Sequence, residues 1–272
     1  MITYPNAKIN LGLNVVRKRL DGFHDIESVF YPIPWCDVLE IVPEKSGTGE
    51  VEFISSGINI PSNGYVNLCE HVYNLIHDDC DLPSVKIHLH KIVPIGAGLG
   101  GGSADAAFAA VMLNEMFDLR LTNDHLRAVV SQAGSDCPFF IENKPAYVTG
   151  RGEILEPFDL DLSGYWIVLV NPNIHIGTKE AYSGITPAEP AFSPRIYLLE
   201  DVPDWKNSVK NDFEKSIFPN HPAIENIKAQ LYDFGADYAS MTGSGSTVFG
   251  LFEEEPKQMD FPEGYFVKIA QL

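Results

Sequence analysis

Residues 94–106 read Pro94-Ile95-Gly96-Ala97-Gly98-Leu99-Gly100-Gly101-Gly102-Ser103-Ala104-Asp105-Ala106. Five of these residues are glycine, and an alanine-rich segment with helical character follows directly. Five glycines this close together would weaken a loop that served only as a connection, because each adds chain entropy that folding must remove. They suit a loop whose backbone N–H groups approach a bulky anion, next to a helix N-terminus that supplies further donors. The stretch therefore predicts a phosphate-binding loop.

Length and charge limit the partners that the chain can have. Its 272 residues, 45% of them apolar, suit two modest domains or one large one. Lysine and arginine number 19 against 37 acidic residues, for a net charge of −18. A field of that sign repels nucleic acid and anionic membranes, so we expect a small-molecule substrate, no nucleic acid and no membrane. Nothing in the sequence indicates an oligomeric state.

The cysteines and the N-terminus indicate a cytoplasmic protein. Cys36, Cys69, Cys80 and Cys137 form no C-x-x-C pair, which argues against a zinc site or a redox motif. Four thiols in a chain of this length are typical of reduced cysteines in the cytosol. The N-terminus lacks the pattern of a signal peptide, and no apolar run reaches membrane-spanning length.

The first half of the chain predicts a mixture of strands and helices. Alternating polarity indicates strands over residues 2–16 and 85–90, and apolar residues at helical spacing indicate a helix over 66–78. Val38–Val42 and Val51–Phe53 predict a hairpin across the turn Ser46-Gly47-Thr48-Gly49. Two helices are expected after the glycine loop, over Ala104–Phe117 and from about Thr122.

The second half predicts a separate α+β sandwich that begins near residue 156. A helix should open at Pro222 and end at Gly235, with its inward face formed by Ile224, Ile227, Leu231 and Phe234. The strands expected around it are Tyr165–Val170, Tyr238–Met241, Thr247–Phe252 and Tyr265–Ala270.

Two familiar phosphate motifs nearly match the loop and both fail. Gly96-x-Gly98-x-x-Gly101 has the spacing of a dinucleotide-binding loop, but no second strand with an acidic residue follows it. In the Walker pattern a lysine should stand where this chain has Gly102, and that lysine neutralises the β- and γ-phosphates.

The whole stretch resembles the ATP loop of the GHMP kinases, which are named for galactose, homoserine, mevalonate and phosphomevalonate. Its long glycine run is similar to that of the branch that phosphorylates 4-diphosphocytidyl-2-C-methyl-D-erythritol, in the non-mevalonate isoprenoid pathway. The resemblance implies an α+β fold of two domains with the active site in the cleft. Residues 1–155 would form a ribosomal-protein-like ATP-binding and catalytic domain, and residues 156–272 a ferredoxin-like α/β sandwich.

The same resemblance implies ATP as co-substrate, with Mg²⁺ expected alongside it. Asn67 and Lys91 align with family positions around the adenosine. The residues that would bind ATP through the loop are Pro94, Gly96, Gly98, Leu99, Gly100, Gly101, Gly102, Ser103 and Ala104.

Pro5-Asn6-Ala7-Lys8-Ile9-Asn10-Leu11 resembles the family's N-terminal signature P-A-K-x-N-L. Lys8 and Asn10 should share one face of the predicted strand. A lysine there can hold the substrate hydroxyl and stabilise the transferred phosphoryl group, while Asn10 would contact the substrate. The alternative is an exposed lysine on an edge strand.

Arg19-Leu20-Asp21-Gly22-Phe23-His24 resembles the family's R-x-D-G-Y-H, with Phe23 in place of tyrosine. An aromatic ring next to a histidine suits a cytosine, because the ring can stack and the imidazole can hydrogen-bond the base edge. Tyr182 would cover the second face of the base. Packing in the turn is the alternative for Phe23 and His24.

Gly134-Ser135-Asp136-Cys137-Pro138-Phe139 is similar to the family's G-A/S-D-V/C-P-F. Asp136 follows the end of a helix and precedes an apolar run, so it should lie partly desolvated near the glycine loop. A carboxylate there can accept the hydroxyl proton, and a nearby Lys8 would keep it ionised. A local Asx turn is the alternative.

Met241-Thr242-Gly243-Ser244-Gly245-Ser246 resembles the family's late T-G-S/T-G loop, which implies substrate contacts for Thr242 and Gly243. An ordinary hairpin turn remains the alternative. Two rival functions are a GHMP kinase for another alcohol, such as mevalonate or homoserine, and a nucleotide-binding protein that has lost catalysis. Phe23 and His24 argue against the first, and the presence of both Lys8 and Asp136 argues against the second.

Overall fold

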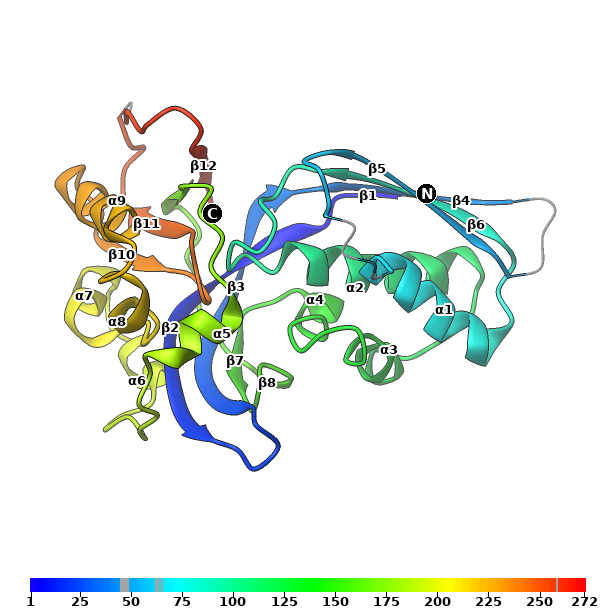
Figure 1. Cartoon of the computed structure of the whole chain (residues 1–272), viewed down its shortest axis with the longest axis horizontal. Helices are drawn as coiled ribbons and strands as arrows, with labels where there is room; N and C mark the ends of the chain where they lie inside the picture. Colours follow the sequence, from blue (N-terminus) through cyan, green and yellow to red (C-terminus); the bar gives the residue numbers. More distant parts are fainter. Residues whose placement is uncertain (45–48, 62–63, 65, 258) are drawn as a thin grey trace. The chain divides into compact units, whose positions relative to one another are not determined.

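The computed structural model describes residues 1–44, 49–61, 64, 66–257 and 259–272, which divide into two compact units (Figure 1). Unit 1 comprises residues 1–7, 35–95 and 100–144, and unit 2 comprises residues 8–34, 96–99 and 145–272. The glycine loop therefore contributes residues 96–99 to unit 2 and its flanking residues to unit 1.

Unit 1 contains a four-stranded sheet in the order β1-β4-β6-β5. Strand β6 pairs antiparallel with β4 and parallel with β5. On β6 the residues Val85, Ile87 and Leu89 are buried and alternate with exposed polar residues, as a half-covered sheet requires. The strands are β1 (Ile2–Thr3), β4 (Val38–Pro43), β5 (Val51–Gly57) and β6 (Val85–Lys91).

Helices α1 (Leu68–Cys80) and α2 (Gly101–Met116) pack side by side on one face of this sheet (Figure 1). The fully buried alanines Ala106, Ala109 and Ala110 of α2 keep the helix surface small, so that neighbouring elements approach it closely. Helices α3 (Asn123–Val130) and α4 (Phe139–Glu142) contact α2 and complete the core of the unit.

Unit 2 holds most of one sheet, in the order β2-β3-β7-β8, and all of a second, in the order β10-β11-β9-β12. Helix α9 (Pro222–Asp233) packs on β10 and β11, and buries Ile224, Ile227 and Leu231. The strands are β2 (Asn6–Lys18), β3 (His24–Cys36), β7 (Ala146–Thr149), β8 (Ile154–Pro157), β9 (Trp166–Asn171), β10 (Tyr238–Met241), β11 (Val248–Phe252) and β12 (Phe266–Gln271). The short helices are α5 (Thr178–Ser183), α6 (Pro194–Tyr197), the 3₁₀ turn η1 (Val202–Asp204), α7 (Trp205–Ser208) and α8 (Glu214–Ile217).

Most of the predicted elements are confirmed, with shifted ends. Strands β6 and β9 to β12 and helices α1, α3 and α9 lie within a few residues of their predicted positions. The strand predicted over 2–16 is interrupted at Tyr4-Pro5, where proline removes a ladder donor. Helix α2 begins at Gly101, three residues before its predicted start.

Two expectations are wrong. Strands β4 and β5 do not form a hairpin, because β6 lies between them and pairs with both. Of the predicted turn, residues 46–48 lie outside the described part of the chain. Phe234 is 44% exposed, because α9 ends at Asp233 and releases it from the inward face. The domain division at residue 155 stays a prediction.

Candidate active site

Helix α2 begins inside the glycine run. Gly100 is its N-cap, with left-handed backbone angles, φ 68° and ψ 13°, that favour glycine. The N–H of Ala104 makes the first helical hydrogen bond, to Gly100 O at 2.9 Å. The N–H groups of Gly101, Gly102 and Ser103 therefore precede the helical ladder at the positive end of the helix dipole. Such an arrangement can bind phosphate.

The segment that carries Asp136 lies against this helix start. A Cβ atom added to Gly134 would lie 3.1 Å from Cys137 Sγ and 3.7 Å from Ser103 Oγ. Burial raises the pKa of the Cys137 thiol to about 12, and the nearby Ser103 side chain opposes that rise. Asp136 itself is partly exposed. Unit 1 thus brings Ser103 of the loop together with residues 134–137.

Lys91 lies at the end of β6, where the chain leaves the sheet for the loop, and is only 4% exposed. Its Nζ donates to Asp37 Oδ2 at 2.5 Å and to Asp105 Oδ2 at 2.6 Å. Asp37 Oδ1 also accepts from the N–H groups of Ile92 and Val93, at 2.5 and 2.8 Å. This buried cluster ties the residues before the loop to helix α2 after it. The predicted contact of Lys91 with adenosine stays a prediction.

Burial raises the pKa of Asp105 to about 7, against the opposing charge of Lys91. Its Oδ1 atom is buried and has no hydrogen-bond partner among the described residues. Two carboxylates therefore share one ammonium, and one carboxylate oxygen is left without a donor. Such a group is sensitive to pH and to the loss of its neighbour.

Asn67 is the N-cap of α1. Its side chain accepts from Cys69 N–H at 2.8 Å, and the Glu70 side chain accepts from the N–H of Asn67 at 3.0 Å. This reciprocal capping box fixes the start of α1. The side-chain oxygen of Asn67 is thus engaged in the cap. The contact of Asn67 with adenosine stays a prediction.

In unit 2, Lys8 and Asn10 lie on the same face of β2, as the alternation of the sequence predicts. Lys8 is 3% exposed, so the alternative of an exposed edge-strand lysine is wrong. Its Nζ donates to Asn10 Oδ1 at 2.6 Å and to Gly98 O at 3.3 Å, and lies 4.4 Å from the centre of the Phe30 ring. The lysine is therefore oriented by carbonyl oxygens and an aromatic face.

The late loop after β10 reaches both Asn10 and the glycine loop. Thr242 Oγ1 accepts from Asn10 N–H at 3.0 Å and lies 3.1 Å from Gly98 O. A side chain at Gly98 would overlap the carbonyl oxygen of Thr242, and one at Gly243 would lie 3.0 Å from Gly98 Cα. The loop connects β10 to β11 as a turn would, but it also holds Gly98 and Asn10 in place.

His24 and Tyr182 stack on each other, with ring centres 4.4 Å apart and planes inclined by 16°. Burial lowers the pKa of His24, and the charge of Lys18 lowers it further. Phe23 is 53% exposed, and the guanidinium of Arg151 lies 4.8 Å from the centre of its ring. Unit 2 thus brings together two of the three rings expected around a cytosine.

Sequence reasoning missed several neighbours of these residues. In unit 1 they are Asp37 and Asp105, and in unit 2 they are Asn211 and Phe213. The last two lie in the run Asn211-Asp212-Phe213-Glu214, whose polar residues follow an irregular segment and do not indicate which groups they contact.

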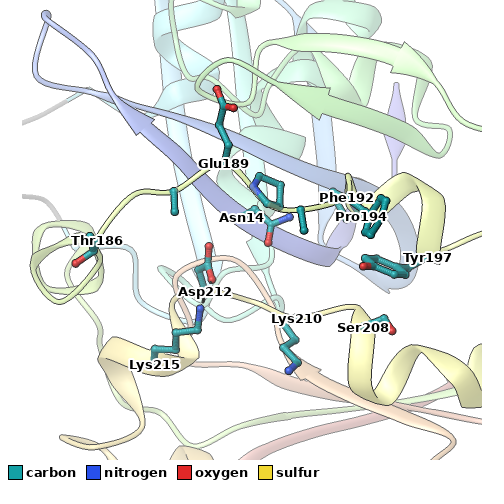
Figure 2. Close-up of a pocket in the computed structure, with 13 residues that line it drawn as sticks. Asn14, Thr186, Glu189, Phe192, Pro194, Tyr197, Ser208, Lys210, Asp212 and Lys215 are labelled. Carbon is teal, nitrogen blue, oxygen red and sulfur yellow. Dashed lines mark hydrogen bonds and ion pairs between the residues drawn. The ribbon is translucent and has the colours of Figure 1, made fainter.

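A cavity of about 280 Å³ opens beside this run in unit 2 (Figure 2). Asp212 and Lys215 line it, together with the rings of Phe192 and Tyr197. Among the described residues that line it, none is a predicted substrate residue.

The chain is similar to known proteins in both sequence and structure. The family described as the GHMP kinases N terminal domain matches residues 67–144, and GHMP kinases C terminal matches residues 196–259. The 4-diphosphocytidyl-2-C-methyl-D-erythritol kinase of Bacteroides fragilis is 49% identical over 267 residues, which cover 97% of each chain. The enzyme of the same name from Cytophaga hutchinsonii is 50% identical over 258 residues, 94% of each chain. A crystal structure of 4-(cytidine 5'-diphospho)-2C-methyl-D-erythritol kinase superposes with a TM-score of 0.80 at 29% identity, covering 94% of this chain and 91% of that one.

The chain therefore belongs to the GHMP kinases, a class of small-molecule phosphotransferases, and has their two-domain α+β fold. Its branch is that of the 4-diphosphocytidyl-2-C-methyl-D-erythritol kinases. Both steps of the resemblance stated from the sequence are confirmed. Among the described residues, no helix is long and apolar enough to cross a membrane.

Proposed function

We propose that the chain transfers the γ-phosphoryl group of ATP to the 2-hydroxyl of 4-diphosphocytidyl-2-C-methyl-D-erythritol. The start of α2 carries this proposal, because the N–H groups of Gly101–Ser103 lie at a helix start that can bind an anion, beside the segment that holds Asp136. The names of relatives that are half identical over nearly the whole chain support the choice of substrate. The activity belongs to the synthesis of isoprenoid precursors by the non-mevalonate route.

Asp136 is the general base of this proposal and Lys8 the electrostatic stabiliser. As the 2-hydroxyl oxygen attacks the γ-phosphorus, the new P–O bond forms and the bond from phosphorus to the ADP oxygen breaks. The hydroxyl proton passes to the Asp136 carboxylate. Lys8 holds the hydroxyl and offsets negative charge on the transferred group, oriented by its hydrogen bond to Asn10.

The rings of Phe23, His24 and Tyr182 recognise the cytosine. A base has two faces for stacking and an edge for hydrogen bonds, and mevalonate and homoserine offer neither. The existing stack of His24 on Tyr182 supports a base-binding surface in unit 2. Asn10, Thr242 and Gly243 lie at the alcohol end of the substrate, where the fully buried Thr242 holds Asn10 in place.

Pro94, Gly96 and the residues from Gly98 to Ala104 bind the triphosphate. Asn67 and Lys91 lie near the adenosine, Lys91 as part of the buried ion cluster behind the loop. We expect Mg²⁺ to arrive bound to ATP, because kinases take most of its ligands from phosphate and water. Within the described ranges, no three His, Cys, Asp or Glu side chains are grouped as metal ligands. The cytoplasmic location and the exclusion of nucleic acid stay predictions from the sequence.

A coupled ADP-release assay tests the proposal with the cytidine-linked alcohol, mevalonate, homoserine and galactose as separate acceptors. We expect turnover of the cytidine-linked alcohol alone. Turnover of mevalonate without turnover of that alcohol would overturn the assignment of the substrate. ATP binding without turnover of any acceptor would instead favour a nucleotide-binding protein that has lost catalysis.

A further inference from the structure

Asn211 uses all of its amide hydrogen-bonding groups inside unit 2. It is 2% exposed, and its Nδ2 donates to the carbonyl oxygens of Met241 and Gly243, at 2.7 and 2.8 Å. Its Oδ1 accepts from the N–H of Phe213 at 2.9 Å. A single amide therefore clamps the backbone on both sides of Thr242. Only a side chain with two donors on one nitrogen can do this at that length.

Thr242, the residue between the two clamped carbonyl groups, is linked to Lys8 by hydrogen bonds through Asn10. Thr242 Oγ1 accepts from the N–H of Asn10 at 3.0 Å, and Asn10 Oδ1 accepts from Lys8 Nζ at 2.6 Å. The amide of Asn10 is anchored in turn, since its Nδ2 donates to Ser28 Oγ at 3.0 Å. Two residues, Thr242 and Asn10, thus lie between Asn211 and the ammonium of Lys8 in this chain of contacts. A shift of the late loop would move the group that orients this ammonium.

The neighbouring Phe213 reaches the other part of the substrate site in unit 2. Its ring meets Tyr182 edge to face, with centres 4.8 Å apart and planes at 85°. Tyr182 stacks on His24. Phe213 is 3% exposed, so it presents a rigid edge to Tyr182.

The run that holds both residues is itself fixed to β2. The N–H of Asp212 donates to Leu13 O at 2.8 Å, and Asp212 Oδ2 accepts from Val15 N–H at 2.9 Å. Figure 2 shows this stretch from the side of the cavity, with Asp212 and Lys215 on its wall. Glu214 Oε1 accepts from the N–H of Met241 at 2.9 Å and so supports the same end of β10.

We infer that Asn211–Glu214 is a positioning segment for the phosphoryl acceptor, in which Asn211 orients Lys8 through Thr242 and Asn10. The inference rests on the proposed function, which assigns Lys8 to the reaction. Asn211 acts through Thr242 and is a positioning residue. Phe213 has the matching role for Tyr182, so four consecutive residues serve both ends of the substrate.

The test compares Asn211→Ser, Thr242→Val and the double variant in the full-length protein. We expect Asn211→Ser to lower kcat about 10–100-fold, because misplacement of a reacting group by about 1 Å has effects of that size. The KM for ATP should change little. The double variant should be no slower than Thr242→Val, because both substitutions interrupt one path. Thr242→Ser keeps the hydroxyl and should restore most of the rate.

Asn114→Ser is the matched control. Asn114 clamps the backbone of Leu121 through its amide, but it does so in unit 1. Its variant should lower Tm and leave kcat unchanged. If Asn211→Ser behaves in the same way, or if its effect on kcat multiplies with that of Thr242→Val, Asn211 has only a structural role.

Lys8→Met separates failure of this inference from failure of the proposed function. Normal kcat in Lys8→Met would remove Lys8 from the reaction, and with it the proposed mechanism. Loss of kcat in Lys8→Met with normal kcat in Asn211→Ser would overturn the positioning segment alone. Should Asn211→Ser not fold, Thr242→Val against Thr242→Ser decides, since equal rates in the two would exclude the path through the hydroxyl.

Discussion

Two lysines are buried almost equally in the two units, and their partners differ. Lys91 in unit 1 is 4% exposed and donates to the carboxylates of Asp37 and Asp105. Lys8 in unit 2 is 3% exposed, and carbonyl oxygens of Asn10 and Gly98 are among the groups that accept from it. Carboxylates neutralise an ammonium as they hold it, whereas carbonyl oxygens orient it.

We call Lys91, Asp37 and Asp105 bracing groups, because they hold the fold, and Lys8 a reacting group, because it acts on the substrate in the proposed reaction. Removing one member of a buried ion cluster leaves an uncompensated charge, and the folded state loses stability. Removing a group that acts only on the reaction lowers the rate and leaves the fold intact. Substitutions around Lys91 should therefore act mainly on the free energy of unfolding, and substitutions around Lys8 mainly on kcat.

Asp136→Asn is expected to have the largest effect, although Asp136 belongs to unit 1 like the bracing carboxylates. Loss of a general base should lower kcat by about 10²–10⁴-fold, because the amide cannot accept the hydroxyl proton. Asp136 is partly exposed, so the free energy of unfolding should change little. ADP release at saturating substrate measures the first quantity and urea unfolding the second.

Asp118→Asn is the control for this substitution, since the Asp118 side chain is 77% exposed in the same unit. It should leave kcat unchanged. A near-normal kcat in Asp136→Asn would mean that Lys8 and substrate positioning suffice. Large destabilisation instead would place Asp136 with the bracing groups.

Lys91→Met should act on stability. It leaves Asp37 and Asp105 buried without their common partner, which typically destabilises a fold by about 3–5 kcal/mol. Lys86→Met is a matched control on the same strand, because Lys86 is 46% exposed and pairs with surface carboxylates. That control should change the unfolding free energy by less than about 1 kcal/mol. Equal urea midpoints for the two variants would contradict the bracing role of Lys91.

The sequence predicts those features of the two units that depend on residues close together in the chain. Alternation along β2 places Lys8 and Asn10 on one face, and the glycine run places a helix start after the loop. Both follow from local periodicity and composition. The motif around Asp136 could likewise be assigned by resemblance.

Partners distant in sequence could not be predicted in the same way. Asp37 and Lys91 are 54 residues apart, and Asn10 and Thr242 are 232 apart. Such contacts depend on strand order, and the order in unit 1 was itself predicted wrongly for β4 and β5. Asn211 carries no local sign that its amide clamps a loop thirty residues later.

The bracing group Asp105 should make the free energy of unfolding depend on pH. The pKa of Asp105 is raised from 3.8 to about 7 in the folded state, chiefly by burial. Between these values the folded protein holds a proton that the unfolded chain releases, so stability falls as the pH rises toward 7. Asp105→Asn removes this titration. We expect the difference in unfolding free energy between wild type and variant to shift by about 1–3 kcal/mol between pH 4.5 and 7.5.

Urea unfolding of both proteins at a series of pH values measures this difference. A constant difference across the series would mean that Asp105 stays ionised throughout. Above pH 8 the two curves should run parallel, because Asp105 is then ionised in both folded and unfolded states.

Phe23→Ala should have the smallest effect of these substitutions. The Phe23 ring is exposed, and the ring contact described for it is the one with the guanidinium of Arg151. If Phe23 stacks on the cytosine, its loss should raise the KM for the cytidine-linked alcohol about 3–10-fold, since an aromatic stack contributes about 0.5–1.5 kcal/mol. The KM for ATP and the free energy of unfolding should stay unchanged. Phe192→Ala is the matched control, because Phe192 is exposed to nearly the same extent, 58% against 53%, and is no part of the proposed site. An unchanged KM in Phe23→Ala would remove Phe23 from the site and leave the stacked pair of His24 and Tyr182 as the base-binding surface.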